Sequence, residues 1–214
     1  EAGYRYIDGW RADYGKRGQL HCHISWHVAL WALERGDVAT MWQVLDADVA
    51  QGGAWGPPLN ILTDTAALLY RAELAGVDVP AERWQAVSDY AAKMFPNPGI
   101  AFADTHAALA HAMAGNTDAL KKIIADAKGP AGDVVKLLAE GFAAIGAGKW
   151  AEATGHLVKT MADHQRIGGS RAQRDLIEYA LLGTLLKQGR ADEARLLLAM
   201  RRPLKVGSAA VKGV

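Results

Sequence analysis

Three histidines and the only cysteine of the chain lie within the stretch HCHISWH at residues 21–27. If this stretch is helical, His23 and His27 are four residues apart and project from one face, while His21 points elsewhere. Two imidazoles on one helical face can share a ligand, bind a metal ion or carry out acid–base chemistry. Cys22 points away from that face, so we interpret it as a small buried apolar group.

Two other apolar segments contain isolated polar residues. Asp64 interrupts residues 61–69, and Asp104 and His106 interrupt residues 100–109. A buried charge needs an ion partner, a hydrogen bond or a metal ion, because burial otherwise shifts its pKa until it is neutral. The resulting candidate cluster is His23, His27, Asp64, Asp104 and His106.

Helices must position these residues, because one pattern recurs along the chain. An apolar run ends at a glycine, a turn residue follows, and an amphipathic run begins. Glycine suits such a turn because a helix commonly ends with one residue in the left-handed conformation, which glycine adopts without a Cβ clash. The turns recur every 33 to 41 residues, a spacing typical of stacked helical hairpins. They are Gly36-Asp37, Gly76-Val77, Gly115-Asn116, Gly148-Lys149 and Gly189-Arg190.

This pattern predicts an all-α fold, an α-solenoid of about five antiparallel hairpins. The first helix of each hairpin is nearly apolar on all sides and belongs on the inside, whereas the second has one apolar stripe. We expect residues 1–202 to form a single solenoid and residues 203–214 to form a loosely held tail. The predicted helix pairs are 20–35 with 38–50, 59–75 with 80–94, 99–114 with 117–127, 132–147 with 150–165, and 171–188 with 191–201.

The candidate residues occupy similar positions in successive first helices. His27 and His106 each lie nine residues before their turn glycine, Asp64 lies twelve before, and Asp104 lies eleven before. Equivalent positions are neighbours in a stack, so we expect a lane of polar side chains along the inner wall. The fourth hairpin has no polar residue in this lane, which separates Glu178 in the fifth hairpin from the cluster.

Three interpretations of the cluster remain open. The side chains can hydrogen-bond to one another and to nearby threonines, and so determine how the hairpins stack. They can instead be the polar anchors of a groove that binds a peptide or small ligand. In the third interpretation, His23, His27 and Asp64 bind zinc or a ferrous-type ion, or a His/Asp pair acts in acid–base catalysis. The residues after His23 do not form the His-Glu-x-x-His motif of zinc proteases.

The last hairpin opens with Gly168-Gly169-Ser170, followed by Arg174 and Asp175. Backbone amides at a helix start, helped by an arginine, can bind an anion, so Arg174 and Asp175 are ligand-binding candidates. A tight turn followed by a helix capped by Ser170 and Gln173 explains the same residues. We favour the turn, because no phosphate-loop pattern surrounds it.

The composition indicates a folded globular protein, since half of the 214 residues are hydrophobic and the formal net charge is +1. The basic residues are scattered, which disfavours nucleic acid and anionic membranes as partners. No run approaches the roughly 20 apolar residues of a membrane span. A single cysteine excludes an internal disulfide and suits a reducing, cytoplasmic compartment. We expect the other histidines at the surface or at helix ends; they are His111, His156 and His164.

Several short motifs from Gln19 to about Leu204 together resemble the tetratricopeptide repeat protein 38 family. The resemblance implies an α-solenoid of degenerate tetratricopeptide-like hairpins, and it implies that this chain corresponds to the C-terminal part of longer family members. No reaction follows from it. The residues that carry it are Cys22-His23, Trp26-His27, Ala29-Leu30, Asp64, Leu69-Tyr70-Arg71, Gly76-Val77, Arg83-Trp84, Phe102, Asp104, His106, Gly168-Gly169-Ser170 and Ala172-Gln173-Arg174-Asp175.

From these observations we expect a binding or scaffold module that recognises a protein segment or a small ligand on its inner surface and needs no cofactor. Such a surface is also compatible with a homo-oligomer. The alternative is a metal-dependent or acid–base enzyme that uses the candidate cluster. We expect a divalent metal only under that alternative.

Overall fold

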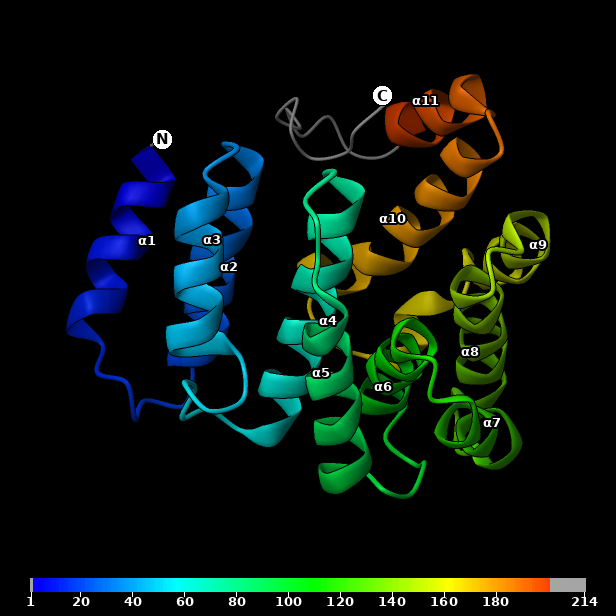
Figure 1. The fold of residues 1–214 in the computed structure, drawn as a ribbon, viewed down its shortest axis with the longest axis horizontal. Helices are drawn as coiled ribbons and strands as arrows, with labels where there is room; N and C mark the ends of the chain where they lie inside the picture. The colour runs from blue at the N-terminus through cyan, green and yellow to red at the C-terminus, as the bar shows by residue number, and fades with distance from the viewer. Residues whose placement is uncertain (1, 201–214) are drawn as a thin grey trace. The chain divides into compact units, whose positions relative to one another are not determined.

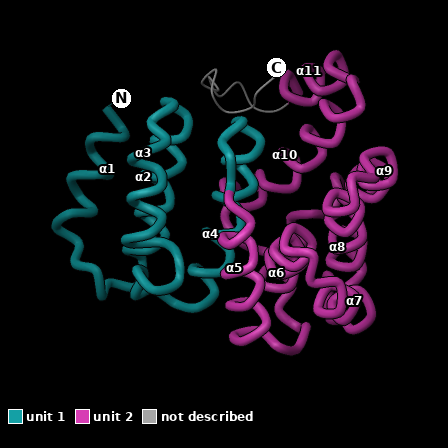
Figure 2. Tube along the Cα trace, in the orientation of Figure 1, with its two compact units in different colours: residues 1–79, 206–212 teal, residues 80–205, 213–214 magenta. Residues whose placement is uncertain are grey.

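The computed structural model describes residues 2–200, so the predicted tail at 203–214 lies outside the described residues. Within residues 2–200 the regular structure is entirely helical, which confirms the predicted all-α class (Figure 1). No helix in this range is long and apolar enough to cross a membrane. The chain divides into two compact units, with a boundary between residues 79 and 80 (Figure 2).

The first unit is built around α2 (His21–Glu34), which packs against the other helices of the unit. The element order is α1 (Ala2–Asp13), α2, α3 (Val38–Val44), the π-helix η1 (Leu45–Val49) and α4 (Pro58–Leu74). Helix α1 was not predicted. Its sequence has two glycines, which disfavour a helix, and none of its residues is buried.

Two ion pairs connect the segment before α2 to η1. The carboxylate of Asp48 lies 2.6 Å from Arg11 Nη1 and 3.2 Å from Lys16 Nζ. Asp48 belongs to the π-helical turn that replaces the last part of the predicted helix 38–50. After this turn the backbone comes so close that a Cβ at Gly53 would lie 2.0 Å from the carbonyl oxygen of Asp46. The wide turn therefore places Asp48 where two cations reach it, and it leaves room only for glycine at residue 53.

The second unit contains the remaining helices, and most begin and end within a few residues of the prediction. The exception is the predicted helix 150–165, which ends at Thr160 and is followed by a separate 3-10 turn. Thr160 Oγ1 donates to Leu157 O at 2.7 Å, and His164 Nδ1 donates to Met161 O at 2.9 Å. These side-chain bonds compete with helix continuation. The elements are α5 (Ala81–Met94), α6 (Ala101–Ala114), α7 (Thr117–Asp126), α8 (Gly132–Gly146), α9 (Trp150–Thr160), η2 (His164–Ile167), α10 (Arg171–Lys187) and α11 (Ala191–Met200).

The predicted turn chemistry is present at the helix ends. The glycines of all five predicted turns have φ between 69° and 82°, the left-handed region in which a side chain is strained. Helix α10 begins with the predicted capping box, in which Ser170 Oγ accepts from the Gln173 amide and Gln173 Oε1 accepts from the Ser170 amide. Local sequence therefore determines where these helices stop and start.

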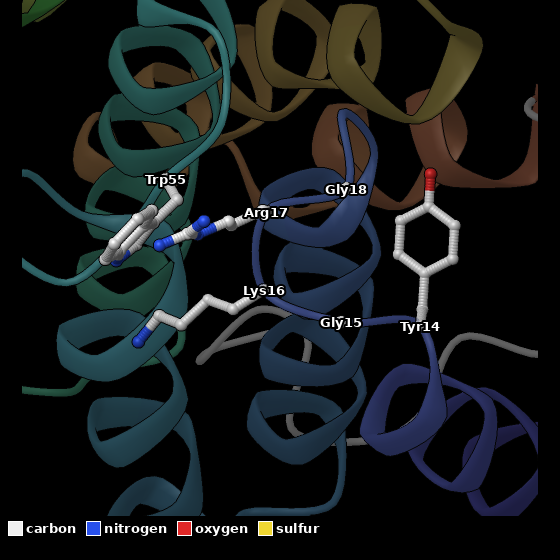
Figure 3. A pocket seen from close by; sticks show the side chains of 6 residues that line it. All are labelled: Tyr14, Gly15, Lys16, Arg17, Gly18 and Trp55. Carbon is white, nitrogen blue, oxygen red and sulfur yellow. The ribbon is translucent and has the colours of Figure 1, made fainter.

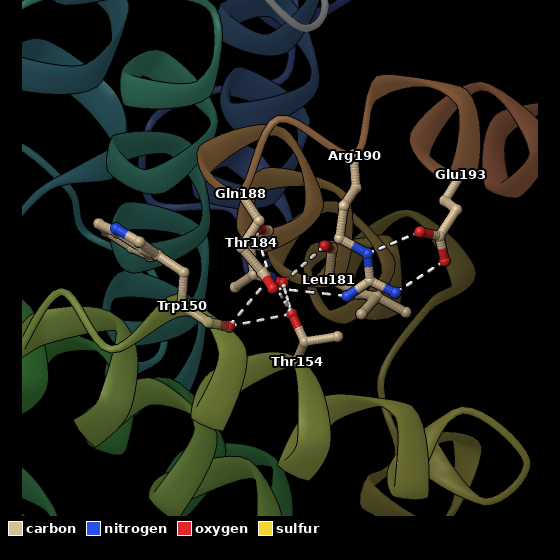
Figure 4. A network of polar contacts seen from close by, with 7 residues as sticks. All are labelled: Trp150, Thr154, Leu181, Thr184, Gln188, Arg190 and Glu193. Atoms are coloured by element: carbon tan, nitrogen blue, oxygen red, sulfur yellow. Dashed lines mark hydrogen bonds and ion pairs between the residues drawn. The ribbon is translucent and has the colours of Figure 1, made fainter.

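A polar network joins α9 to α10 within the second unit (Figure 4). Thr154 Oγ1 donates to Thr184 Oγ1 at 2.8 Å, and both side chains are buried. Gln188 Nε2 donates to Thr154 Oγ1 at 2.7 Å and to the carbonyl of Trp150 at 3.2 Å. Because buried donors and acceptors are costly when unsatisfied, this network favours one register between the two helices.

Helices α6 and α8 approach closely at Gly146, where a Cβ would lie 2.6 Å from the carbonyl oxygen of Ala112. We expect Gly146→Ala to lower the free energy of unfolding by about 2 kcal/mol, because backbone on both sides must shift. The matched control is Gly155→Ala in α9, where a Cβ meets nothing within 4 Å. That variant should gain about 0.5 to 1 kcal/mol from helix propensity. Urea denaturation of both variants checks the prediction, and equal effects would contradict the close approach.

Candidate functional site

The central contact of the candidate site joins α2 to α4 within the first unit. His23 Nδ1 lies 2.9 Å from Asp64 Oδ2, although the two residues are 41 positions apart in the chain. The side chain of Asp64 is completely buried, and that of His23 is 19% exposed. Every residue of α4 from Ile61 to Tyr70 is buried, and most of them are apolar. The packing therefore buries the Asp64 carboxylate and leaves its imidazole partner half-buried.

The Asp64 carboxylate decides the protonation of His23. A carboxylate only accepts hydrogen bonds, so Nδ1 carries the proton and Nε2 is the atom open to a ligand. Burial alone lowers the pKa of His23, but the hydrogen bond and the negative charge of Asp64 outweigh burial and raise this pKa above its ordinary value. Within residues 2–200, Nε2 of His23 makes no hydrogen bond.

His27 lies beside His23 on the same helix. The two ring centroids are 4.9 Å apart and the ring planes are nearly perpendicular. Trp26 packs against both rings, with centroid distances of 5.3 Å to His23 and 4.9 Å to His27. Burial, and then the neighbouring charge of His23, lower the pKa of His27 to about 4. The site thus combines one imidazole that readily holds a positive charge with one that is neutral at pH 7.

The same two helices hold several buried polar atoms that lack a hydrogen-bond partner within residues 2–200. Each such atom typically costs about 1 to 3 kcal/mol, which makes an accumulation of them in one region unusual for a purely structural core. Three of the residues are completely buried, and Thr65 is 6% exposed. The atoms are Ser25 Oγ, Trp26 Nε1, Thr63 Oγ1 and Thr65 Oγ1.

Asp104 and His106, the other two members of the predicted cluster, belong to the second unit. Asp104 Oδ2 accepts a hydrogen bond from the backbone amide of Gly99 at 2.8 Å, at the start of α6. His106 Nδ1 donates to the carbonyl of Phe102 at 2.8 Å, and its ring packs edge-on against the Phe102 ring. Burial raises the pKa of Asp104, although its backbone hydrogen bonds act in the opposite direction. Each residue thus has a local role in shaping α6.

The loop before α10 uses Arg174 for its own structure. The Arg174 guanidinium donates to the carbonyl of Gly169, while Ser170 caps the helix. A Cβ at Gly169 would lie 2.3 Å from the ring of Phe102, so the loop packs tightly against α6. Asp175 lies 3.9 Å from Arg171. These contacts fit the interpretation of Gly168-Gly169-Ser170 as a tight turn before a capped helix.

Among residues 2–200, no group of three or more His, Cys, Asp or Glu side chains is arranged to hold a metal ion. His23, His27 and Asp64 are neighbours, but the inward nitrogen of His23 is already bonded to Asp64. Cys22 is buried, and burial raises the pKa of its thiol to about 12. The thiol therefore stays protonated, as expected for a packing residue.

Sequence reasoning missed a buried histidine in the second unit. We expected His111 at the surface or a helix end. It does lie in the last turn of α6, but its side chain is buried, and its Nδ1 lies 2.8 Å from Ser88 Oγ. Asn116 Nδ2 also donates to Ser88 Oγ, at 3.4 Å. Burial lowers the pKa of His111 to about 4. One sequence signal could have indicated a buried polar partner for His111. Ser88 lies four residues after Trp84, on the apolar stripe of α5, so its hydroxyl faces α6.

Over residues 2–200, the fold and this site define an all-helical protein in which a buried aspartate contacts a half-buried histidine. No family model matches the chain, and no solved structure was found that matches it.

Proposed function

We propose that the chain is a tetratricopeptide-like helical-repeat module that binds a protein segment or a small ligand through the polar site on α2 and α4. Two packing contacts support the repeat architecture. In the first unit, α2 packs against α4, and in the second unit, α6 packs against α8. These are first helices of consecutive predicted hairpins, which pack together in a solenoid. The resemblance to the tetratricopeptide repeat protein 38 family supports the same architecture.

The observation that carries the proposed function is the 2.9 Å contact between His23 and the fully buried Asp64. Desolvating a carboxylate is expensive, and an ion pair in an apolar core adds little net stability compared with apolar packing. A carboxylate that orients an imidazole, by contrast, is a common way to present the second ring nitrogen in one protonation state and direction. The pair is therefore better suited to ligand recognition than to stabilising the core.

The ligand group that fits is a carboxylate or an amide carbonyl. When His23 is protonated, its Nε2 donates a hydrogen bond to such an oxygen. The neutral ring of His27 can either donate or accept, so it adapts to a second polar atom of the ligand. Trp26, which is completely buried, packs against both imidazoles and supports their rings from inside the protein. A few polar groups within apolar walls are typical of ligand sites.

Nitrogen-15 NMR of histidine-labelled protein tests this proposal with a panel of short carboxylates, simple amides and blocked dipeptides. We expect at least one class to shift the Nε2 signals of His23 and His27, and His23→Gln should abolish binding. The matched control is His164→Gln, which removes an imidazole bonded to the carbonyl of Met161 in the second unit. Binding that survives His23→Gln, or no binding at about 10 mM of any panel member, would refute the proposed site.

A second candidate function is acid–base catalysis, favoured by the same orientation of His23. An imidazole fixed by a carboxylate through Nδ1 presents Nε2 as a proton acceptor, which is the arrangement of a general base. Hydrolysis of p-nitrophenyl acetate is a generic readout for such an imidazole. Turnover above that of an equal concentration of free imidazole, lost in His23→Gln and retained in His164→Gln, would favour an enzyme over a binding module.

The metal-dependent form of this alternative uses Nε2 of His23 and the ring of His27, with Asp64 orienting His23 from behind. Titration of tag-free protein with zinc chloride tests it. Stoichiometric binding that disappears in both His23→Ala and His27→Ala would support the metal site, and binding unaffected by either change would reject it.

A further inference from the structure

A separate pocket of about 500 Å³ lies in the first unit, between the loop after α1 and the loop before α4. Figure 3 shows Arg17 reaching across to the ring of Trp55, with Lys16 on the same side and Tyr14 pointing away. We propose that this pocket binds an acidic peptide segment, in which a carboxylate side chain adjoins an apolar one. The residues lining it are Tyr14, Gly15, Lys16, Arg17, Gly18 and Trp55.

The Arg17 side chain is held in place by an aromatic ring. Its guanidinium carbon lies 5.1 Å from the centre of the Trp55 ring, within the range of a cation–π contact. A guanidinium held over a ring in this way can still direct its N–H donors to a planar carboxylate. Because the ring already orients the side chain, less rotamer entropy is lost when a ligand binds.

Arg17 also carries the positive charge that is available in this pocket. The neighbouring Lys16 is 3.2 Å from Asp48 and 2.6 Å from the carbonyl of Ala47, so its charge is already matched. Arg17 has no ion pair or hydrogen bond within residues 2–200. An anionic group on the partner therefore complements the pocket, and a cationic group is repelled.

The backbone of the loop keeps Lys16 and Arg17 at its tip. The Gly18 amide donates to the carbonyl of Gly15 at 2.9 Å, which closes a turn around the two basic residues. Gly15 has φ of 69°, a conformation that favours glycine. A Cβ at Gly18 would lie 2.4 Å from the Tyr14 ring, so the ring packs directly on the turn. The pocket is thus presented by a closed turn instead of an extended loop.

The apolar part of the pocket distinguishes a peptide from a simple anion. Trp55 is 59% exposed, an unusually large exposed indole surface beside a positive charge. Gly15, one of the lining residues, has no side chain, and a Cβ there would meet nothing within 4 Å, so the backbone at Gly15 leaves room for a partner side chain. A free inorganic anion would use the guanidinium and leave this apolar surface in water. The site is independent of the His23 and Asp64 contact, because none of its lining residues belongs to that contact.

Fluorescence anisotropy tests the proposal with a labelled, blocked hexapeptide of alternating glutamate and leucine. We expect binding to the wild-type chain to weaken at least about tenfold in Arg17→Ala and in Trp55→Ala. Arg17→Lys keeps the charge but loses the planar fork, so it should weaken binding by roughly threefold. The matched control is Arg5→Ala, which removes an exposed arginine of α1 outside the pocket and should leave affinity within about twofold.

Other probes separate a peptide site from a general anion site. The same peptide with lysine in place of glutamate should not bind, and sodium acetate or phosphate should not displace the acidic peptide at matched ionic strength. Equal loss in Arg5→Ala and Arg17→Ala would show charge attraction without a site and would overturn the proposal. Displacement by phosphate alone, or no binding at about 1 mM peptide, would overturn it as well.

Discussion

Replacing Asp64 by asparagine is expected to lower the free energy of unfolding by about 3 kcal/mol, because it removes one partner of a buried charge pair and leaves the other partner in place. Asparagine has nearly the same shape, so packing is retained and the loss reports on the charge. The substitution also changes His23. Without the carboxylate, burial becomes the main influence on the imidazole and should bring its pKa below the ordinary value.

Asp104→Asn is the matched control, since Asp104 is also buried, at 3% exposure. Its carboxylate accepts from the backbone amide of Gly99, and an asparagine oxygen can accept the same bond. We therefore expect a loss below about 1 kcal/mol. Chemical denaturation measures both variants, and NMR titration follows His23. If Asp64→Asn costs no more than Asp104→Asn and the His23 pKa stays raised, the Asp64 carboxylate does not hold His23 as described.

Acid is expected to destabilise the protein as the pH falls from about 6.5 to about 4, because His27 and His111 are both neutral in the fold. Burial lowers each pKa to about 4, whereas an unfolded chain has histidines near 6.5. Between these values the unfolded state binds more protons than the folded state. Stability is therefore fully present above about pH 6.5 and is lost on acidification.

The size of this effect follows from the two pKa differences. Each histidine contributes about 1.4 kcal/mol per pH unit across its window, so His111 alone costs up to about 3 kcal/mol by pH 4. The pKa of His27 is lowered to the same value, so His27 should contribute a similar amount. His23 acts in the opposite sense. Its raised pKa adds stability below the unfolded value, and this part is lost as the pH rises through the folded pKa.

Urea denaturation at about pH 7.5, 5.5 and 4.5 measures the slope of stability against pH. In His111→Gln the slope should become shallower, since glutamine keeps a polar group near Ser88 but does not titrate. His27→Gln should make the slope shallower by a similar amount. A slope that is unchanged in both variants would mean that neither imidazole is kept neutral by burial.

Local sequence predicts the helices well, for reasons that are visible at single residues. Gly115 ends α6 in the left-handed conformation, and Ser170 with Gln173 begins α10. Such signals act over a few residues and need no tertiary contact. Where they are absent the prediction was wrong. Helix α1 contains two glycines and was missed, and the predicted helix 150–165 ends at Thr160.

The candidate site is a mixture of what spacing can predict and what it cannot. The four-residue interval between His23 and His27 predicts two neighbouring imidazoles, and their ring centroids are 4.9 Å apart. The count back from the turn glycines predicted that Asp64 lies on a helix next to that of His23 and His27. The count did not show that an oxygen of Asp64 contacts His23 Nδ1. Asp104 followed from the same count, although its visible role is to accept from Gly99.

The helical class, most helix ends and the pair of imidazoles on α2 could be predicted from the sequence, because each depends on backbone preferences or on the helical period. Tertiary structure alone decided which nitrogen of His23 is bonded, why the pKa of His27 falls to about 4, and that His111 is buried against Ser88. The physical reason is that desolvation and charge pairing depend on atoms from distant helices. Composition and spacing do not report those distances.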